Sequence, residues 1–118
     1  MTNEELIERT MNFAVRVLRM AEKLPRSVAG QVVARQVARS GTSVAANYRA
    51  ALRGKSRADF INKITIVLEE ADETGFWIEF ASRAKLLPQE RLDPLRSEAE
   101  QLVRIFSATR ATARSHKS

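Results

Sequence analysis

Apolar residues recur every three or four positions along almost the whole chain, the spacing that places them on one face of an α-helix. The pattern is interrupted only near Pro25, Gly54 and Pro88, which are residue types that end helices or open turns. The chain is therefore expected to form helices over about residues 3–24, 27–53, 56–87 and 89–113.

No segment alternates apolar and polar residues with the period of a strand, and the expected connections are short. Amphipathic helices joined in this way pack against their neighbours in alternating directions. We predict an all-α fold, an antiparallel up-down-up-down four-helix bundle. The length of 118 residues suits one domain over residues 1–118, with a frayed basic tail from about residue 114 to 118.

The helical periodicity also predicts which side chains are buried. The first helix is expected to turn an apolar face inward that contains Ile7, Met11, Ala14, Leu18 and Ala21. Four further apolar residues widen this face beyond a narrow stripe: Phe13, Val15, Val17 and Met20. In the second helix the small-to-medium series Val33, Val37, Ser40, Val44, Tyr48 and Ala51 faces inward. The principal core residues of the domain are predicted to be Val37, Val44, Tyr48, Phe60, Ile64, Val67, Ala71, Ile78, Leu102 and Phe106.

Residues at the segment boundaries indicate how the helices begin and end. Asn3, Ser27 and Ser56 are expected to cap helix N-termini, and Gly54 is expected to adopt the left-handed conformation after the second helix. Pro94 allows two interpretations: a new helix start after Asp93, or a turn from Pro88 that leads into a kinked helix.

The residue types that perform most catalysis are scarce. The chain has no cysteine and one histidine, His116, which lies in the tail, so thiolate chemistry, a bundle di-iron site and a histidine-activated nucleophile are not predicted. Gly54-Lys55-Ser56 matches only the end of a P-loop. We expect no enzyme activity, no cofactor and no metal, because acids spaced as Glu69 and Glu73 are more often salt-bridged or solvated than cation ligands. The acidic N-terminal segment and the lack of a long apolar run predict neither an export signal nor a membrane span, so a cytoplasmic protein is expected.

Charge is segregated along the sequence, within a net charge of +6. Residues 26–63 contain one acid, Asp59, and the bases Arg26, Arg35, Arg39, Arg49, Arg53, Lys55, Arg57 and Lys63. Residues 69–79 contain no base and the acids Glu69, Glu70, Asp72, Glu73 and Glu79. Such segregation is compatible with an anionic partner or with complementary faces on neighbouring helices or subunits.

Four arginines fall on one side of the second helix, opposite its core face. With 100° per residue, Arg35, Arg39, Arg49 and Arg53 lie within about 40° of a common line that extends roughly 27 Å. Two functions fit such a stripe: non-specific binding of RNA or DNA phosphates, with Lys55 and Arg57 contributing, or pairing with the acidic third-helix face of another subunit in a protein scaffold. A solvated or locally salt-bridged face is the alternative without a partner.

The third helix carries apolar side chains away from its core stripe. Phe76, Trp77 and Phe80 cannot all point inward together with Ile64 and Ile78. Either the first and last helices cover this second face, or a homo-oligomer buries it. In the second case the interface residues are predicted to be Glu69, Glu73, Phe76, Trp77 and Phe80.

A polar series borders the core side of the second helix: Gln36, Ser40, Ser43 and Asn47. Small polar side chains allow neighbouring helices to approach closely, and their buried polar atoms can form hydrogen bonds with one another. The alternative interpretation of this series is that it lines a ligand pocket.

Three runs of sequence together resemble one known family. They are SGTSVAANYRA at residues 40–50, SRADFI at 56–61 and IVLEEADETGFW at 66–77. They are similar to the four helix bundle protein family, the intervening-sequence proteins of bacterial 23S ribosomal RNA genes. The resemblance extends over nearly the whole chain, except that Ala50 and Ala51 stand where the family often has a glutamate.

The resemblance implies a bundle that assembles as a ring-like homopentamer. It also implies a relationship to the accessory protein of diversity-generating retroelements, which binds nucleic acid through a basic surface. No biochemical role is assigned to most members.

Overall fold

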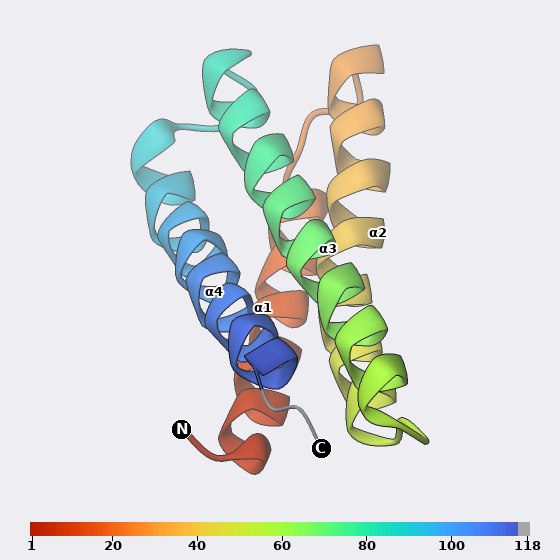
Figure 1. Ribbon diagram of the computed structural model, residues 1–118. Coiled ribbons are helices and arrows are strands. Elements are labelled where there is room, and N and C mark those ends of the chain that lie inside the picture. The colour runs from red at the N-terminus through yellow and green to blue at the C-terminus, as the bar shows by residue number, and fades with distance from the viewer. Residues whose placement is uncertain (116–118) are drawn as a thin grey trace.

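The computed structural model describes residues 1–115 and contains no strand in that part of the chain. Its helices are α1 (Asn3–Glu22), α2 (Val28–Leu52), α3 (Arg57–Arg83) and α4 (Gln89–Ser115). Consecutive helices run in opposite directions, and the N-terminus lies at the same end of the bundle as the C-terminal end of α4 (Figure 1). Each helix packs against its neighbours in sequence, and α1 also contacts α4. The predicted all-α four-helix bundle is confirmed.

The starts of three helices are fixed by side-chain caps. Ser27 Oγ accepts a hydrogen bond from the Gly30 amide, and Ser56 Oγ accepts one from the Asp59 amide, both at 3.1 Å, as expected. At α1 the cap is Thr2 rather than Asn3, because Thr2 exchanges hydrogen bonds with Glu5 in a capping box. These bonds to Thr2 lower the pKa of Glu5.

The end of α2 differs from the expectation for Gly54. None of the glycines has a positive φ, so the predicted left-handed conformation of Gly54 is wrong. A Cβ atom there would lie 2.9 Å from Asp59 Oδ2 and 3.1 Å from the Ala51 carbonyl oxygen. Gly54 therefore allows the Asp59 side chain and the end of α2 to approach each other closely in the α2–α3 turn. The residue with a left-handed conformation is instead Lys85 in the α3–α4 turn, with φ 58°.

The last helix begins directly after Pro88 and includes Pro94. A new helix start at Pro94 is therefore wrong, because Gln89 already precedes it within α4. The helix also continues to Ser115, so residues 114 and 115 of the expected frayed tail are helical, and residues 116–118 lie outside the described part of the chain.

Only part of the wide apolar face predicted for α1 is buried. Met11 and Leu18 are 39% and 42% exposed. The face that packs inward consists of Leu6, Thr10, Phe13, Ala14, Val17, Met20 and Ala21. Apolar residues cover more than half of the circumference of α1, and the stripe with Phe13 fills the centre of the bundle while the other stripe remains outside.

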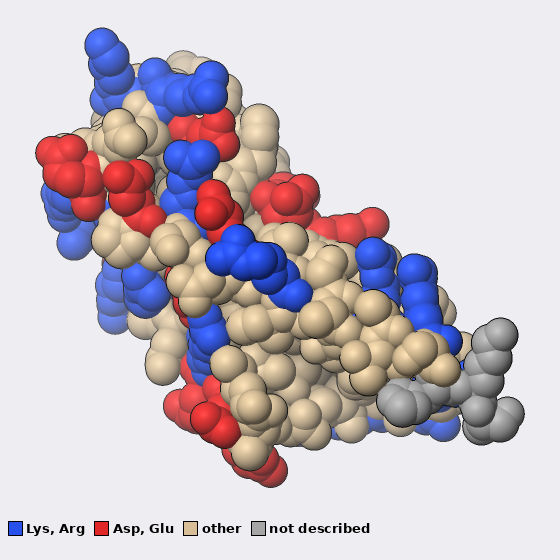
Figure 2. Space-filling view, turned by 60° about the vertical axis from the view of Figure 1, so that its left-hand side comes forward, with Lys and Arg blue, Asp and Glu red and all other residues tan. Residues whose placement is uncertain are grey.

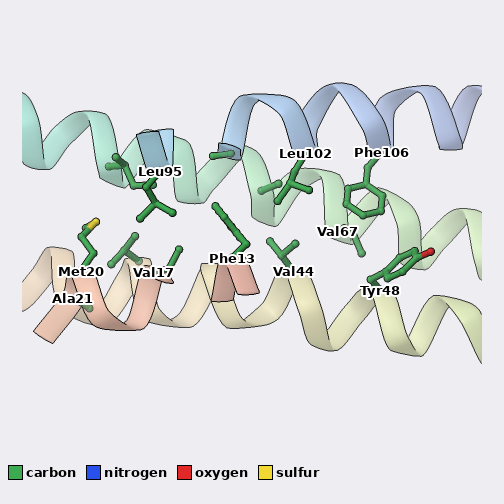
Figure 3. Packing of buried hydrophobic residues seen from close by; sticks show 14 of the residues in the cluster. Phe13, Val17, Met20, Ala21, Val44, Tyr48, Val67, Leu95, Leu102 and Phe106 are labelled. Atoms are coloured by element: carbon green, nitrogen blue, oxygen red, sulfur yellow. The ribbon is translucent and has the colours of Figure 1, made fainter. Parts of the chain in front are cut away.

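The core extends along the axis of the bundle. Tyr48 of α2 lies against Phe106 of α4, with Val44 and Leu102 in the adjacent layer (Figure 3). Every predicted core residue is buried except Phe60, which is half-buried and packs against the cluster from the first turn of α3. Burial, together with the charge of Glu4, raises the pKa of the Tyr48 hydroxyl.

The approach of α2 to α1 depends on Gly41. A Cβ at Gly41 would lie 2.6 Å from Val17 Cγ1, whereas a Cβ at Gly75 of α3 would find its nearest neighbour at 3.7 Å. We expect Gly41→Ala to lower the free energy of unfolding by about 1–2 kcal/mol through overpacking, despite the better helix propensity of alanine. Gly75→Ala should raise it by up to about 1 kcal/mol. Urea denaturation of both variants checks this prediction, and equal shifts in the same direction would contradict it.

Candidate functional site

Basic side chains concentrate where α2 ends and α3 begins. Arg49, Arg53, Lys55 and Arg57, which we call the turn cluster, are all exposed. Within the described residues none of them forms an ion pair. The nearby acid is Asp59, whose Oδ2 accepts a hydrogen bond of 3.3 Å from the backbone amide of Lys55. The charges of the turn cluster are therefore not neutralised by acids within the described residues.

Arg39 is different, because it is neutralised within the chain. Its guanidinium group donates to Glu70 at 2.9 Å and also to Glu73, both on α3. The hydrogen bond to Glu73 and the charge of Glu70 raise the pKa of Arg39. The arginine stripe predicted along α2 is thus interrupted by acids from the neighbouring helix.

The structure consequently divides the predicted nucleic-acid residues into groups. Arg49 and Arg53 lie with Lys55 on one groove, while Arg35 is an exposed base nearer the start of α2. Of the predicted interface acids, Glu73 is held by Arg39, whereas Glu69 is exposed and has no ion pair among the described residues.

An open groove of about 900 Å³ lies on the outer side of α1 and α2. One wall is apolar and comes from Met11, Val15 and Leu18 of α1. The floor is made by small residues of α2, Thr42, Ala45, Ala46 and Ala50. The turn-cluster end of the groove carries the charged residues Arg49, Arg53, Lys55, Asp59 and Lys63. We call this feature the α1–α2 groove.

Sequence reasoning missed the α1–α2 groove, because Met11 and Leu18 were assigned to the core. The sequence does indicate that the apolar surface of α1 is wider than one stripe, but it does not indicate which part of that surface remains outside the core. Lys63 was likewise not among the predicted site residues.

The second apolar face of α3 is exposed. Phe76 and Phe80 are 55% and 41% exposed, and Ile66 is 37% exposed on the same side of the helix. Trp77 is half-buried against the core and contacts both phenylalanines, with ring centroids 4.9 and 5.6 Å away. The interpretation that α1 and α4 cover this face is therefore wrong. We call Ile66, Phe76, Trp77 and Phe80 the aromatic face.

Three members of the polar series along α2, Ser40, Ser43 and Asn47, form hydrogen bonds inside the protein. The hydroxyl groups of Ser40 and Thr74 are 2.8 Å apart and buried, and Asn47 Nδ2 donates to the Ser43 carbonyl oxygen and hydroxyl. No buried side-chain nitrogen or oxygen within residues 1–115 lacks a partner. These contacts support close helix packing rather than a ligand pocket.

Other surfaces are mixed in charge. The view in Figure 2 shows acidic and basic side chains side by side toward one end of the molecule. Ion pairs join α1 to α4 through Arg9 and Glu98 at 2.7 Å, and α4 to α3 through Arg96 and Glu79 at 3.3 Å. The hydrogen bond from Arg9 to Glu98 raises the pKa of the arginine.

Residues 1–115 contain neither a cluster of metal-ligating side chains nor a long apolar helix. No group of three or more histidine, cysteine or acidic side chains is placed to hold a metal ion. None of the helices combines the length and the apolar character that crossing a membrane requires.

The chain has clear relatives. Residues 2–108 match the model of a family described as 23S rRNA-intervening sequence protein. The fold is similar to the crystal structure of a protein with unknown function from the S23 ribosomal protein family of Bacteroides thetaiotaomicron VPI-5482. That match has a TM-score of 0.86 and 32% identity, and covers 94% of this chain and 99% of the other. No curated protein matches, and neither match names a catalytic activity. Because the family match spans nearly the whole chain, the protein belongs to the 23S rRNA-intervening sequence protein family.

Proposed function

We propose that this protein is a cytoplasmic, non-catalytic accessory protein that binds nucleic acid without sequence preference and acts as a homo-oligomer. The observation that carries the proposal is the turn cluster, four exposed bases without ion pairs among the described residues. Guanidinium and ammonium groups in such a setting bind phosphate oxygens and release the counterions of the nucleic acid.

Sequence-independent binding follows from what surrounds the turn cluster. Sequence-specific recognition of single-stranded RNA stacks the bases on aromatic side chains and reads their edges by hydrogen bonds. The exposed aromatic residues Phe76 and Phe80 lie toward the other end of α3, at least 19 residues or about 28 Å from Arg57. Phe60, which is near Arg57, is half-buried against the core. RNA and DNA are therefore both suitable partners, through their shared phosphate backbone.

Oligomerisation is part of the proposal because one turn cluster gives few phosphate contacts. Several copies held in one assembly bind one strand by multivalency, which raises the apparent affinity without new contacts. The exposed aromatic face and the apolar wall of the α1–α2 groove support self-association. A pentamer is the assembly that the family resemblance suggests.

The test is a titration of a labelled oligonucleotide at about 50 mM salt and then at rising salt, where electrostatic binding weakens. We expect the unmodified protein to bind and the variant Arg53→Ala/Lys55→Ala/Arg57→Ala to bind at least tenfold more weakly. Its log-affinity against log-salt slope should be shallower, by roughly 0.7–0.9 for each phosphate that the variant no longer neutralises.

A matched control removes the same charge at the other end of the bundle. Lys23, Lys85 and Arg91 are exposed bases near the α1–α2 and α3–α4 connections. The variant Lys23→Ala/Lys85→Ala/Arg91→Ala should retain binding. Equal weakening of the two variants, or no binding by the unmodified protein, would overturn the proposal. Intact oligomers that bind no nucleic acid would favour the alternative, a protein-interaction scaffold.

A further inference from the structure

Each chain exposes two apolar surfaces on different helices. On the α1–α2 groove the wall residues Met11, Val15 and Leu18 are 39–46% exposed. On α3 the aromatic face exposes Phe76 and Phe80 to a similar extent. Contiguous apolar surface of this kind on a helical bundle marks an interaction site. Neither surface is covered by other described residues of its own chain.

The two surfaces are complementary in side-chain size. The groove floor is formed by small side chains, Thr42, Ala45 and Ala46, beside the longer side chains of α1. The aromatic face instead presents large side chains at positions 66, 76 and 80, which recur on one side of α3. A ridge of large side chains on one helix packs into a groove on a second helix, and small side chains on the second helix make that groove deeper.

Their charges are also complementary. One end of the groove is lined by four bases, Arg49, Arg53, Lys55 and Lys63, and by one acid, Asp59. The aromatic face is flanked by Glu69 and Glu73, and Glu69 is exposed without an ion pair in the described part of the chain. An occupant of this groove should thus be a helix with a bulky apolar face and adjacent acids. The chain carries such a helix, α3, on another side of the molecule.

We propose that the α1–α2 groove of one chain binds the aromatic face of α3 from a second copy of the same chain. This inference rests on the proposed homo-oligomer and specifies its contact. The two surfaces differ, so the contact is head-to-tail: every copy uses its groove toward one neighbour and its aromatic face toward the other. Repeating such a contact around an axis closes a ring. In this contact Arg49 can pair with Glu69 of the neighbour, which leaves Arg53, Lys55 and Arg57 for phosphate.

The absence of cysteine from the sequence makes a direct test possible. Ala46→Cys places a thiol on the groove floor, and Phe76→Cys places one on the aromatic face. With a flexible bismaleimide, the double variant should form a ladder of covalent multimers. Each single variant should stay uncross-linked, and an equimolar mixture of the two should give covalent dimers. The control Ala46→Cys/Ser107→Cys, with its second thiol at an exposed position on α4, should give none.

Cross-linking of Phe76→Cys to itself, or none in the mixture, would overturn the head-to-tail contact. Light scattering supplies the second measurement. Ala46→Trp fills the groove floor at an exposed position, and should reduce the assembly to single chains of 13.3 kDa while circular dichroism stays unchanged. An oligomer that persists in this variant rejects the proposed contact but not oligomerisation. An unmodified protein of 13.3 kDa rejects both, and the oligonucleotide titration tests the nucleic-acid proposal separately.

Discussion

Replacing Val44 with aspartate is expected to lower the free energy of unfolding by several kcal/mol. Val44 is fully buried in the middle of α2, beside Leu102 and Phe13 in the core (Figure 3). A carboxylate at position 44 has no cation to pair with in the core. It must either be buried as an unpaired charge or become protonated, and either outcome lowers the free energy of unfolding by about 3–5 kcal/mol. Because small domains are stable by only about 5–15 kcal/mol, this cost is a large fraction of the total. Helical circular dichroism during urea denaturation measures it.

The control introduces the same residue at a site in contact with water. Ala108 is exposed on α4, so Ala108→Asp should change the free energy of unfolding by no more than about 0.5 kcal/mol. A Val44→Asp variant as stable as Ala108→Asp would show that position 44 is not in the core.

The inward face of α2 was predictable because its sequence permits one solution. Its buried residues Val33, Val37, Val44 and Tyr48 form the only stripe that avoids the exposed arginines. Charged side chains are costly to bury, so they mark the outer side of a helix as clearly as apolar ones mark the inner side. The four-helix class follows from such patterns and from the short connections.

The orientation of α1 was not predictable in the same way. Both the stripe with Phe13 and the stripe with Met11 have helical spacing, and few charges separate them. The choice is made by contact across the bundle, where Gly41 of α2 leaves room for Val17. The orientation of α1 therefore depends on how two helices pack together, and the periodicity of a single helix does not specify it.

The same limit applies to the candidate site. The angular positions of the arginines on α2 could be calculated, and all of them are exposed as expected. The pairing of Arg39 with Glu70 and Glu73 depends on the alignment of α3 beside α2, which no single helix specifies. The α1–α2 groove likewise exists only once two helices are placed together.

Truncation of Phe106 is the second large effect, with an expected decrease of about 3–5 kcal/mol in the free energy of unfolding for Phe106→Ala. The ring is fully buried on α4, and its centroid is 5.3 Å from that of Tyr48 at an interplanar angle of 55°. Alanine removes the apolar area and leaves a cavity that the surrounding helices can close only in part. Phe106→Leu retains most of the volume, so its destabilisation should be smaller than that of the alanine variant.

A double-mutant cycle separates the ring interaction from the cavity. If the two rings interact directly, the destabilisations from Tyr48→Leu and Phe106→Leu should not add, and the coupling should be about 0.5–1.5 kcal/mol. Urea denaturation of both single variants and of the double variant gives this energy. Additive destabilisations would mean that each ring stabilises the bundle only by filling space. In that case the contact of Tyr48 on α2 with Phe106 on α4, whose side chains meet across the core, would stabilise the bundle through burial of apolar surface and not through a specific aromatic interaction.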